Sequence, residues 1–422
     1  MSTLLFAVLV LAGKLAYVHN GNIWVKTLPD GGAIQLSQSG DAASPQWSRS
    51  GHWLTFQQKD KIIAVSVDGE RHEIAADHAA WSSQYDELAF LDTEGLRTVR
   101  FDGSTMRNRV VLRHSHEAQI SGFAWNPDAS AFAVSVISPD PGGRPEFRVG
   151  HLWRVNSDGT QAQEIFTPKD QGGVVPIGWS SDGQYVLVQF DPDFSASLAA
   201  DGLALLSVPV YGGTAHELAS NVLPHKDFLS IVSERREILV VDGAGRETWR
   251  NKRLTLIDPA TGKRDYVTDE KSVVVSASWS PDGTQIAYVT GPDERPSEHQ
   301  TVGSVVLPNG RISSQVIRVP DSSPQTLVNQ RRIWIVGSDG KPRQLTSDPL
   351  YRDEYPVWSA DGQTICFIRV DQQDRATLWG IDLISGALRK LLDDPGTVTP
   401  KNAWFGYYGH FDWYKEFAPS EN

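Results

Sequence analysis

The residues best suited to acid–base or metal chemistry are two histidines and a few neighbours that stand just ahead of recurring tryptophans. His78 and His410 each lie three residues before a tryptophan. The rest of the set is Asp77, next to His78, and the run Asp353, Glu354 and Tyr355, in which Tyr355 also lies three residues before a tryptophan. Imidazole and carboxylate groups around one opening can bind a divalent cation or transfer protons. The alternative is that these are ordinary polar residues of a wet channel mouth. We therefore predict a ligand-binding site, assign no catalytic residue and no bound metal, and leave a divalent cation open as a cofactor.

A second candidate is a group of aromatic residues near the end of the chain: Trp404, Phe405, Tyr407 and Tyr408. Clustered aromatic side chains can form a platform for a peptide or a sugar. They can equally pack as a plug over the last strand of the fold. The sequence leaves both interpretations open.

Other motifs for chemistry are weak or missing. The chain has no Gly-x-Ser-x-Gly elbow, no GxxxxGK[ST], no GxGxxG after a strand and no HExxH. Its single cysteine, Cys366, excludes intramolecular disulfides and paired-cysteine zinc sites. The HxH motif at His114 lacks a third ligand, and the spacing of Asp191, Asp193 and Asp201 does not fit a calcium loop. The formal charge of −12 argues against nucleic acid as the main partner.

The elements that must position these groups come from a repeat. The stretch Ser276–Gly283 reads SASWSPDG, a short strand that ends in tryptophan and a turn, and the apolar run IAYV follows. Pro and Gly at these positions are typical of a tight hairpin turn. We call the tryptophan of each copy of this repeat its anchor. In every copy the first apolar residue of the next strand follows the anchor by seven positions, and this spacing identifies a degenerate copy with Ile231 at the anchor position. The anchors are Trp47, Trp81, Trp125, Trp179, Ile231, Trp279 and Trp358.

Repeats of about 40–50 residues with four short strands are the signature of a propeller blade. The segment from residue 14 supplies the later strands of a unit, and GHFDW at 409–413 has the form of its missing first strand. We therefore predict an all-β, eight-bladed β-propeller whose first blade is completed by the C-terminal strand, with seven blades as the alternative. The single domain is predicted at 14–416, after a possible signal or apolar segment at 1–13 and before a tail at 417–422. Its blades are predicted at 14–41 with 408–416, 42–75, 76–117, 118–172, 173–222, 223–270, 271–350 and 351–396.

The motifs WSPDG with IAYV, then IW…SDG and RQLTSD, resemble the repeat of TolB-type propellers, a WD40-like or PD40 repeat. The repeat is also similar to the N-terminal propeller of the dipeptidyl peptidase IV and prolyl oligopeptidase families. The resemblance covers nearly the whole chain and implies the fold, whereas its turn and packing residues imply no activity. We expect neither the α/β domain that precedes the blades of TolB nor the hydrolase domain of the peptidases.

Length variation is concentrated on one face of the predicted propeller, which also carries the channel mouth with His78 and His410. The extended connections are 138–147, 191–201, 243–250, 291–331, which contains a hairpin-like pair of strands, and 393–408. Random drift would lengthen loops on both faces, so one decorated face indicates a binding surface.

These features predict a non-catalytic binding or scaffold module of the cell envelope that engages a protein, peptide or glycan partner, as the TolB resemblance implies. The alternative is a hydrolase or lyase acting on a peptide or saccharide with an acid–base or metal site at the channel mouth. The apolar run Leu4–Leu11 resembles a signal peptide without its basic segment and favours export to the periplasm or cell surface. No stretch is long enough for an ordinary transmembrane helix, and we expect a monomer.

Overall fold

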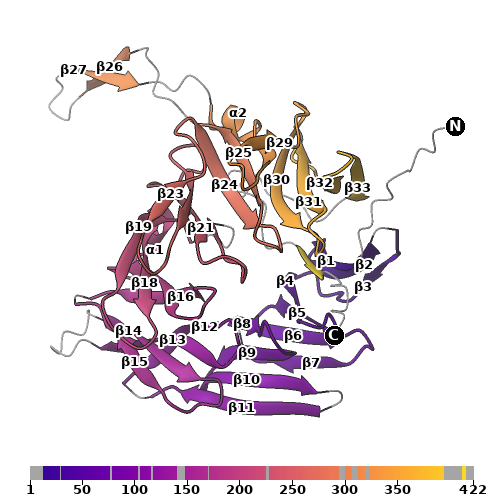
Figure 1. The fold of residues 1–422 in the computed structure, drawn as a ribbon, viewed down its shortest axis with the longest axis vertical. Coiled ribbons are helices and arrows are strands. Elements are labelled where there is room, and N and C mark those ends of the chain that lie inside the picture. Colours follow the sequence, from indigo (N-terminus) through magenta and orange to yellow (C-terminus); the bar gives the residue numbers. More distant parts are fainter. Residues whose placement is uncertain are drawn as a thin grey trace.

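Within its described residues, the computed structural model of this chain contains eight four-stranded antiparallel sheets, which are arranged in a ring (Figure 1). The structure describes residues 13–28, 30–76, 78–102, 105–115, 117–139, 148–169, 171–224, 228–293, 300–306, 312–318, 323–393 and 411–414. This architecture is the predicted all-β, eight-bladed β-propeller, and the degenerate repeat around Ile231 forms a blade of its own. We number the blades 1 to 8 in chain order.

The first four blades contain sixteen strands. Blade 1 contains β1 (Gly13–His19), β2 (Asn22–Leu28), β3 (Ala33–Gln35) and β34 (Phe411–Tyr414). Blade 2 contains β4 (Ala42–Trp47), β5 (Trp53–Gln58), β6 (Lys61–Ser66) and β7 (Arg71–Ile74). Blade 3 contains β8 (His78–Trp81), β9 (Glu87–Asp92), β10 (Gly95–Asp102) and β11 (Thr105–Arg113). Blade 4 contains β12 (Gln119–Trp125), β13 (Ala131–Pro139), β14 (Arg148–Asn156) and β15 (Gln163–Phe166).

The last four blades also carry two short helices and an extra hairpin. Blade 5 contains β16 (Gly173–Trp179), β17 (Tyr185–Asp191), α1 (Ala196–Asp201), β18 (Leu203–Pro209) and β19 (His216–Val222). Blade 6 contains β20 (Leu229–Ser230), β21 (Ile238–Asp242), β22 (Arg253–Ile257) and β23 (Arg264–Tyr266). Blade 7 contains β24 (Ser272–Trp279), β25 (Ile286–Pro292), the hairpin β26 (Gln300–Val306) and β27 (Ile312–Arg318), α2 (Pro324–Val328), β28 (Arg332–Val336) and β29 (Pro342–Gln344). Blade 8 contains β30 (Tyr351–Trp358), β31 (Thr364–Asp371), β32 (Ala376–Asp382) and β33 (Leu388–Leu392).

The seven-residue spacing in the sequence is the register of the first hairpin of each blade. The tryptophan lies directly opposite the first apolar residue of the next strand in the pairs Trp47–Leu54, Trp81–Leu88, Trp125–Phe132, Trp179–Val186, Trp279–Ile286 and Trp358–Ile365. In the turn after Trp279, the Ser280 hydroxyl donates to Asp282 Oδ1 at 2.6 Å and Gly283 has a φ of 64°. Serine, aspartate and glycine therefore close the hairpin locally, as these turn residues predict.

The tryptophans also join successive blades. The indole N–H donates at 3.1–3.2 Å to the carbonyl of the residue just before the tryptophan of the preceding blade in the pairs Trp81–Gln46, Trp125–Ala80, Trp179–Ala124 and Trp358–Ser278. The series is interrupted at Trp279, because its buried indole N–H has no hydrogen-bond partner among the described residues. The blade before it, blade 6, lacks an anchor tryptophan and has a first strand of two residues.

The ring is closed by strands from opposite ends of the chain. β34 pairs antiparallel with β1, from Lys14 opposite Tyr414 to Tyr17 opposite Phe411. This confirms that the C-terminal strand completes the N-terminal blade. Pairing also removes an open sheet edge at the point where the ring would otherwise end.

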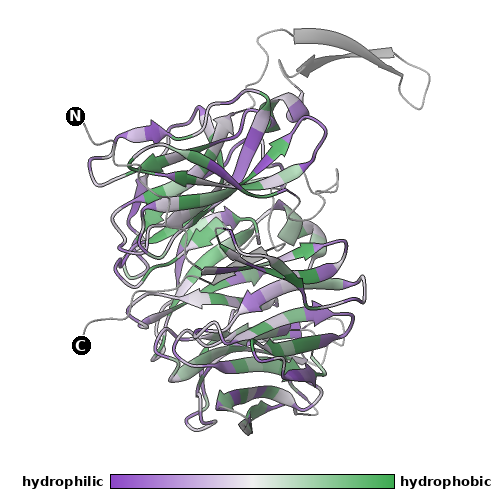
Figure 2. Cartoon of the chain, turned by 90° about the vertical axis from the view of Figure 1, so that its right-hand side faces the viewer, coloured by the Kyte–Doolittle hydropathy of each residue, from purple (hydrophilic) through white to green (hydrophobic). Residues whose placement is uncertain are grey.

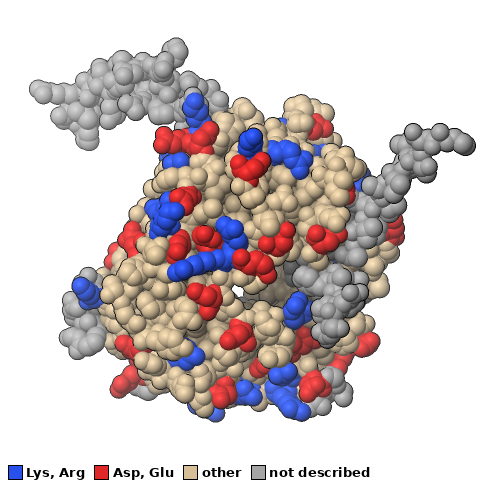
Figure 3. Space-filling view, in the orientation of Figure 1, with Lys and Arg blue, Asp and Glu red and all other residues tan. Residues whose placement is uncertain are grey.

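The two faces of the ring differ in their connections. The insertion face carries the connections between second and third strands and those between blades, and the turn face carries the turns after first and third strands. Most hydrophobic residues lie on the strands and most hydrophilic residues in the connections (Figure 2). The predicted hairpin of the largest insertion is present as β26 and β27, which form a two-stranded sheet of their own. A space-filling view shows a central opening with charged side chains of both signs around it (Figure 3).

Candidate functional site

The insertions of blades 5, 6 and 7 are joined along the insertion face. We call residues 191–201, 243–250 and 324–331 of these insertions the insertion belt. The carboxylate of Asp201, at the end of α1, accepts hydrogen bonds from Nε and Nη2 of Arg246 at 2.7 and 2.9 Å. The backbone N–H of Gly245 donates to the Asp201 carbonyl at 3.0 Å. The insertions of blades 5 and 6 are therefore held together by a bidentate ion pair and a backbone bond.

Arg331 continues this connection into the interior. Its guanidinium is buried, and Nη1 donates to Glu354 Oε1 at 2.9 Å. Nη2 donates to the hydroxyl and the carbonyl of Thr248 at 2.9 and 3.2 Å. Because Thr248 belongs to the blade 6 insertion and Glu354 to the first strand of blade 8, one arginine of blade 7 joins three blades.

Two further arginines of blade 8 are buried in ion pairs. Arg369 donates from Nε and Nη2 to the two carboxylate oxygens of Asp353, at 2.7 and 3.1 Å. Arg352 donates from Nη1 to Asp374 at 2.8 Å, and its Nε lies 3.4 Å from Glu354 Oε1. A buried charge is tolerated only when it is paired, so these contacts fix the first strand of blade 8 rigidly.

The acidic part of the predicted ligand-binding site thus lies in a different environment from the one expected. Asp353 and Glu354 are 0% and 2% exposed and are bound by arginines, whereas the sequence places them around an exposed channel mouth. Tyr355 is half-buried and packs against the core between blades 8 and 1. It has a left-handed φ of 55° at an irregularity in the β30–β31 register. The structure therefore gives these three residues packing and ion-pair contacts within the fold.

The histidine part of the predicted site lies elsewhere on the ring. His78 is exposed, and its ring stands edge-on to that of Phe123 with centroids 5.0 Å apart. It lines a cavity of about 200 Å³ together with Ser44, which occupies the equivalent position of blade 2. That cavity is lined by residues of blades 2 and 3. The other predicted members, Asp77 and His410, lie outside the described residues.

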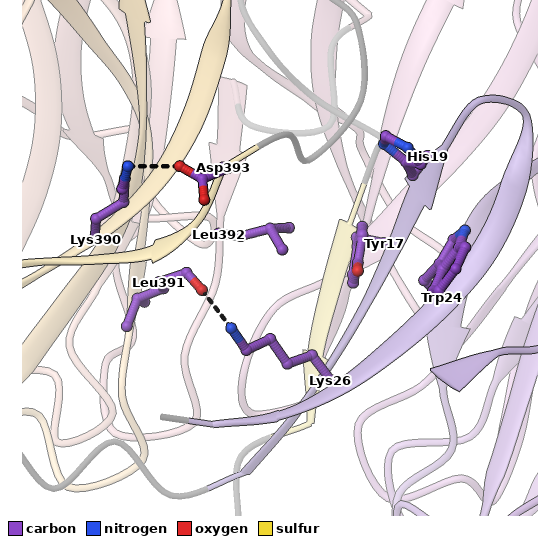
Figure 4. A pocket seen from close by; sticks show the side chains of 8 residues that line it. All are labelled: Tyr17, His19, Trp24, Lys26, Lys390, Leu391, Leu392 and Asp393. Atoms are coloured by element: carbon purple, nitrogen blue, oxygen red, sulfur yellow. Dashed lines mark hydrogen bonds and ion pairs between the residues drawn. The ribbon is translucent and has the colours of Figure 1, made fainter. Parts of the chain in front are cut away.

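The predicted aromatic patch also lies outside the described residues: Trp404, Phe405, Tyr407 and Tyr408. A cavity of about 440 Å³ is present at the seam between blades 8 and 1 (Figure 4). Tyr17 and Trp24 line one side, and Leu392 projects toward Tyr17 from the other. Lys26 crosses the seam and donates from Nζ to the Leu391 carbonyl at 2.9 Å. Aromatic rings beside a lysine can hold a planar or an anionic group.

The weaker metal motifs are engaged in local hydrogen bonds. Both ring nitrogens of His114 are bonded, to the Asp92 carbonyl and to the Ile120 N–H, at 3.0 and 3.1 Å. Asp191 accepts from the backbone N–H of Ser195 at 3.1 Å. Among the residues that the structure describes, no three His, Cys, Asp or Glu side chains are grouped closely enough to hold a metal ion.

Lys252 is the most unusual titratable residue beneath the insertion belt. It is 1% exposed, and its Nζ donates to the carbonyls of Ala244 and Gly245 at 3.1 and 2.8 Å. Burial lowers the pKa of its ammonium group from 10.5 to about 8, because the charged form loses its hydration. Lys252 therefore anchors the blade 6 insertion at a cost in desolvation.

This lysine should make stability depend on pH. Between pH 8 and 10.5 the unfolded chain holds the proton and the folded chain releases it, so stability rises with pH in this range. Wild type should therefore gain about 2–3 kcal/mol in free energy of unfolding relative to Lys252→Met between pH 7 and pH 10. Urea unfolding of both proteins at the two pH values measures this difference. The exposed Lys263→Met serves as the control, and a pH-independent difference between wild type and Lys252→Met would contradict the assignment.

The sequence-based candidates do not include the buried cations of this region, which are Lys252, Arg331, Arg352 and Arg369. The sequence contains one indication of such residues. Arg369 interrupts the apolar run TICFIRV, where an unpaired charge would be costly. Charged residues inside apolar strands therefore mark ion pairs that short motifs do not reveal.

Helices in the described part of the chain are too short or too polar to cross a membrane. No family model matches the chain. The Tol-Pal system protein TolB of Anaeromyxobacter dehalogenans is 31% identical over 123 residues, which is 27% of each chain. The chain thus spans about a quarter of the length of this relative.

Similar solved structures include Porphyromonas gingivalis dipeptidyl peptidase 4, with a TM-score of 0.57 and 10% identity over 89% of this chain and 57% of that chain. TolB from Acinetobacter baumannii matches with a TM-score of 0.37 and 14% identity over 96% of this chain and 67% of that chain. The first likeness shows a shared propeller fold. The predicted resemblance to the peptidase propellers is therefore confirmed at the level of the fold, and the resemblance to TolB is found in the sequence of about a quarter of the chain.

Proposed function

We propose that this chain is a non-catalytic propeller of the cell envelope that binds a protein partner through its insertion face. The observation that carries the proposal is Arg331, which joins the insertions of blades 6 and 7 to blade 8 through buried contacts with Thr248 and Glu354. A surface fixed in this way loses little conformational entropy when a partner binds. Long connections held rigidly on one face are the usual setting of binding residues.

The comparisons support the same proposal from a separate direction. The relative matched over about a quarter of this chain is named as a protein of the Tol-Pal system, which favours a protein as the partner. The buried ion pairs of Asp353 and Glu354 also suit a supporting role better than proton transfer to a substrate. An exported location, in the periplasm or at the cell surface, belongs to this proposal.

Photo-crosslinking from the two ends of one strand tests the choice of face. A photoreactive amino acid at Arg250, before β22, lies on the insertion face, and one at Lys263, after β22, lies on the turn face. Both side chains are exposed, at 50% and 74%. We expect Arg250 variants to form one crosslinked product with a single envelope protein, and Lys263 variants to leave that protein unlinked.

Equal crosslinking from both positions, or none from Arg250, would argue against a binding surface on the insertion face. Arg331→Met supplies a second readout, because it loosens the belt without touching Arg250. It should reduce the crosslinked product while the protein stays folded by circular dichroism.

A further inference from the structure

A groove lies on the turn face, between blades 3 and 4, away from the insertion belt. Its volume is about 430 Å³. Blade 3 supplies most of its lining, and blade 4 adds the turn residue Ala129 and Ser157. The charged residues that line it are Glu87, Arg100, Asp102, Arg107 and Arg109. A groove with three arginines stands out in a chain whose formal charge is −12.

The arginines share one face of the blade 3 sheet. Arg100 on β10 lies directly opposite Arg107 on β11, and Arg109 lies opposite Thr98 two residues along. Directly opposed residues of antiparallel strands point to the same side, and like charges in such a pair are destabilising. A local rule of sheet pairing that is broken without an evident gain in packing is a common sign of a binding site.

Acidic residues offset part of this repulsion, since Glu87 on β9 lies directly opposite Arg100 on the other side of β10. Arg107 lies 3.6 Å from Asp102, but both side chains are more than half exposed and contribute little. Arg100 stands over the ring of Tyr85, 4.4 Å from its centroid. Arg109 donates to the carbonyl of Ser157 at 3.3 Å, and the nearby carboxylate of Asp158 offsets part of its charge.

A buried hydroxyl adds an independent observation. Thr98 lines the groove, is 1% exposed, and its Oγ1 has no hydrogen-bond partner among the described residues. Leaving a buried hydroxyl unpaired costs free energy, and a ligand group in the groove would remove that cost. The groove therefore presents arginines and an unsatisfied hydroxyl to the same space.

We propose that this groove binds an extended acidic segment of a partner protein. Arg107 and Arg109 are two residues apart on one strand, and alternate side chains of an extended peptide repeat at the same spacing of about 6.7 Å. Carboxylates at alternate positions of such a peptide would meet Arg109 and the Arg100–Arg107 pair together. Glu87 and Asp102 flank the arginines and disfavour a fully anionic ligand such as a nucleic acid strand.

Binding of fluorescein-labelled hexaglutamate, followed by fluorescence anisotropy, tests the groove. The double variant Arg107→Gln/Arg109→Gln should weaken binding by about tenfold or more at low salt, and raised salt should weaken wild-type binding similarly. Arg113→Gln is the matched control. Arg113 lies on the same strand, is exposed and pairs with Glu94 at 3.0 Å outside the groove. Its variant should bind hexaglutamate as wild type does.

Thermal unfolding without peptide separates binding from a structural role. Because Arg100 and Arg107 repel each other, Arg107→Gln should leave the melting temperature unchanged or raise it, whereas a structural arginine would lower it. Unchanged hexaglutamate binding by the double variant, or tighter binding of an oligothymidylate of equal length, would overturn the proposal. The crosslinking experiment concerns the opposite face, so each proposal can fail without the other.

Discussion

Replacing Glu354 with glutamine should lower the free energy of unfolding by about 3–5 kcal/mol, because it leaves the buried guanidinium of Arg331 without a counter-charge and that of Arg352 with Asp374 alone. Glu354 accepts from Arg331 at 2.9 Å and lies 3.4 Å from Arg352, and all three side chains are no more than 3% exposed. Glutamine keeps the shape and removes only the charge. Urea unfolding of wild type and Glu354→Gln measures the change.

An exposed ion pair of similar length supplies the control. Lys61 and Glu73 lie 2.8 Å apart, but their side chains are 47% and 53% exposed. Glu73→Gln should leave stability nearly unchanged, because solvent screens exposed ion pairs. A double variant, Arg331→Met/Glu354→Leu, should recover part of the loss by removing both charges. If Glu354→Gln proves as stable as wild type, the buried network does not hold the insertion face.

A chain that ends at residue 409 should lose its stable monomeric form. Where its unfolding can be measured, the free energy of unfolding should be lower by more than about 5 kcal/mol. It lacks β34, and β1 then exposes an unpaired edge from Lys14 to Tyr17. Leu15 and Ala16 of that edge are 1% and 0% exposed in the closed ring. Open edges and uncovered apolar residues promote association between chains.

Size-exclusion chromatography and thermal unfolding measure this effect. A chain that ends at residue 416, beyond β34, is the control and should behave as the full chain does. The same elution volume and melting temperature for both truncated chains would show that closure by β34 contributes little.

The blade count and the closing strand could be predicted because the repeat encodes local hairpin register. Trp47 and Leu54 are seven positions apart because they face each other across one tight turn. The same register places Ile231 opposite Ile238, next to the observed pair of Ser230 and Leu239, although the strand has lost its tryptophan. Turn chemistry and apolar spacing are short-range properties, so a single sequence reveals them.

The ion pairs of blade 8 could not be predicted in the same way, because a bulge shifts their register. Trp358 pairs with Ile365, and an unbroken ladder would then place Arg369 opposite Glu354. An irregularity between Glu354 and Val357 instead places Arg369 opposite Asp353. The contact from Arg331 to Thr248 spans 83 positions between blades, and no local pattern indicates it.

Closure of blade 1 also determines when this protein can finish folding. Lys14 and Tyr414 pair although they are 400 residues apart in the chain. At about 5–20 residues per second, a ribosome needs roughly 20–80 s to make the intervening chain. During that interval β1 pairs with β2 on one edge, and its other edge has no partner. β34, the last of the described strands, therefore completes the first blade, and chaperones that cover the open edge of β1 until then would govern the yield of the closed ring.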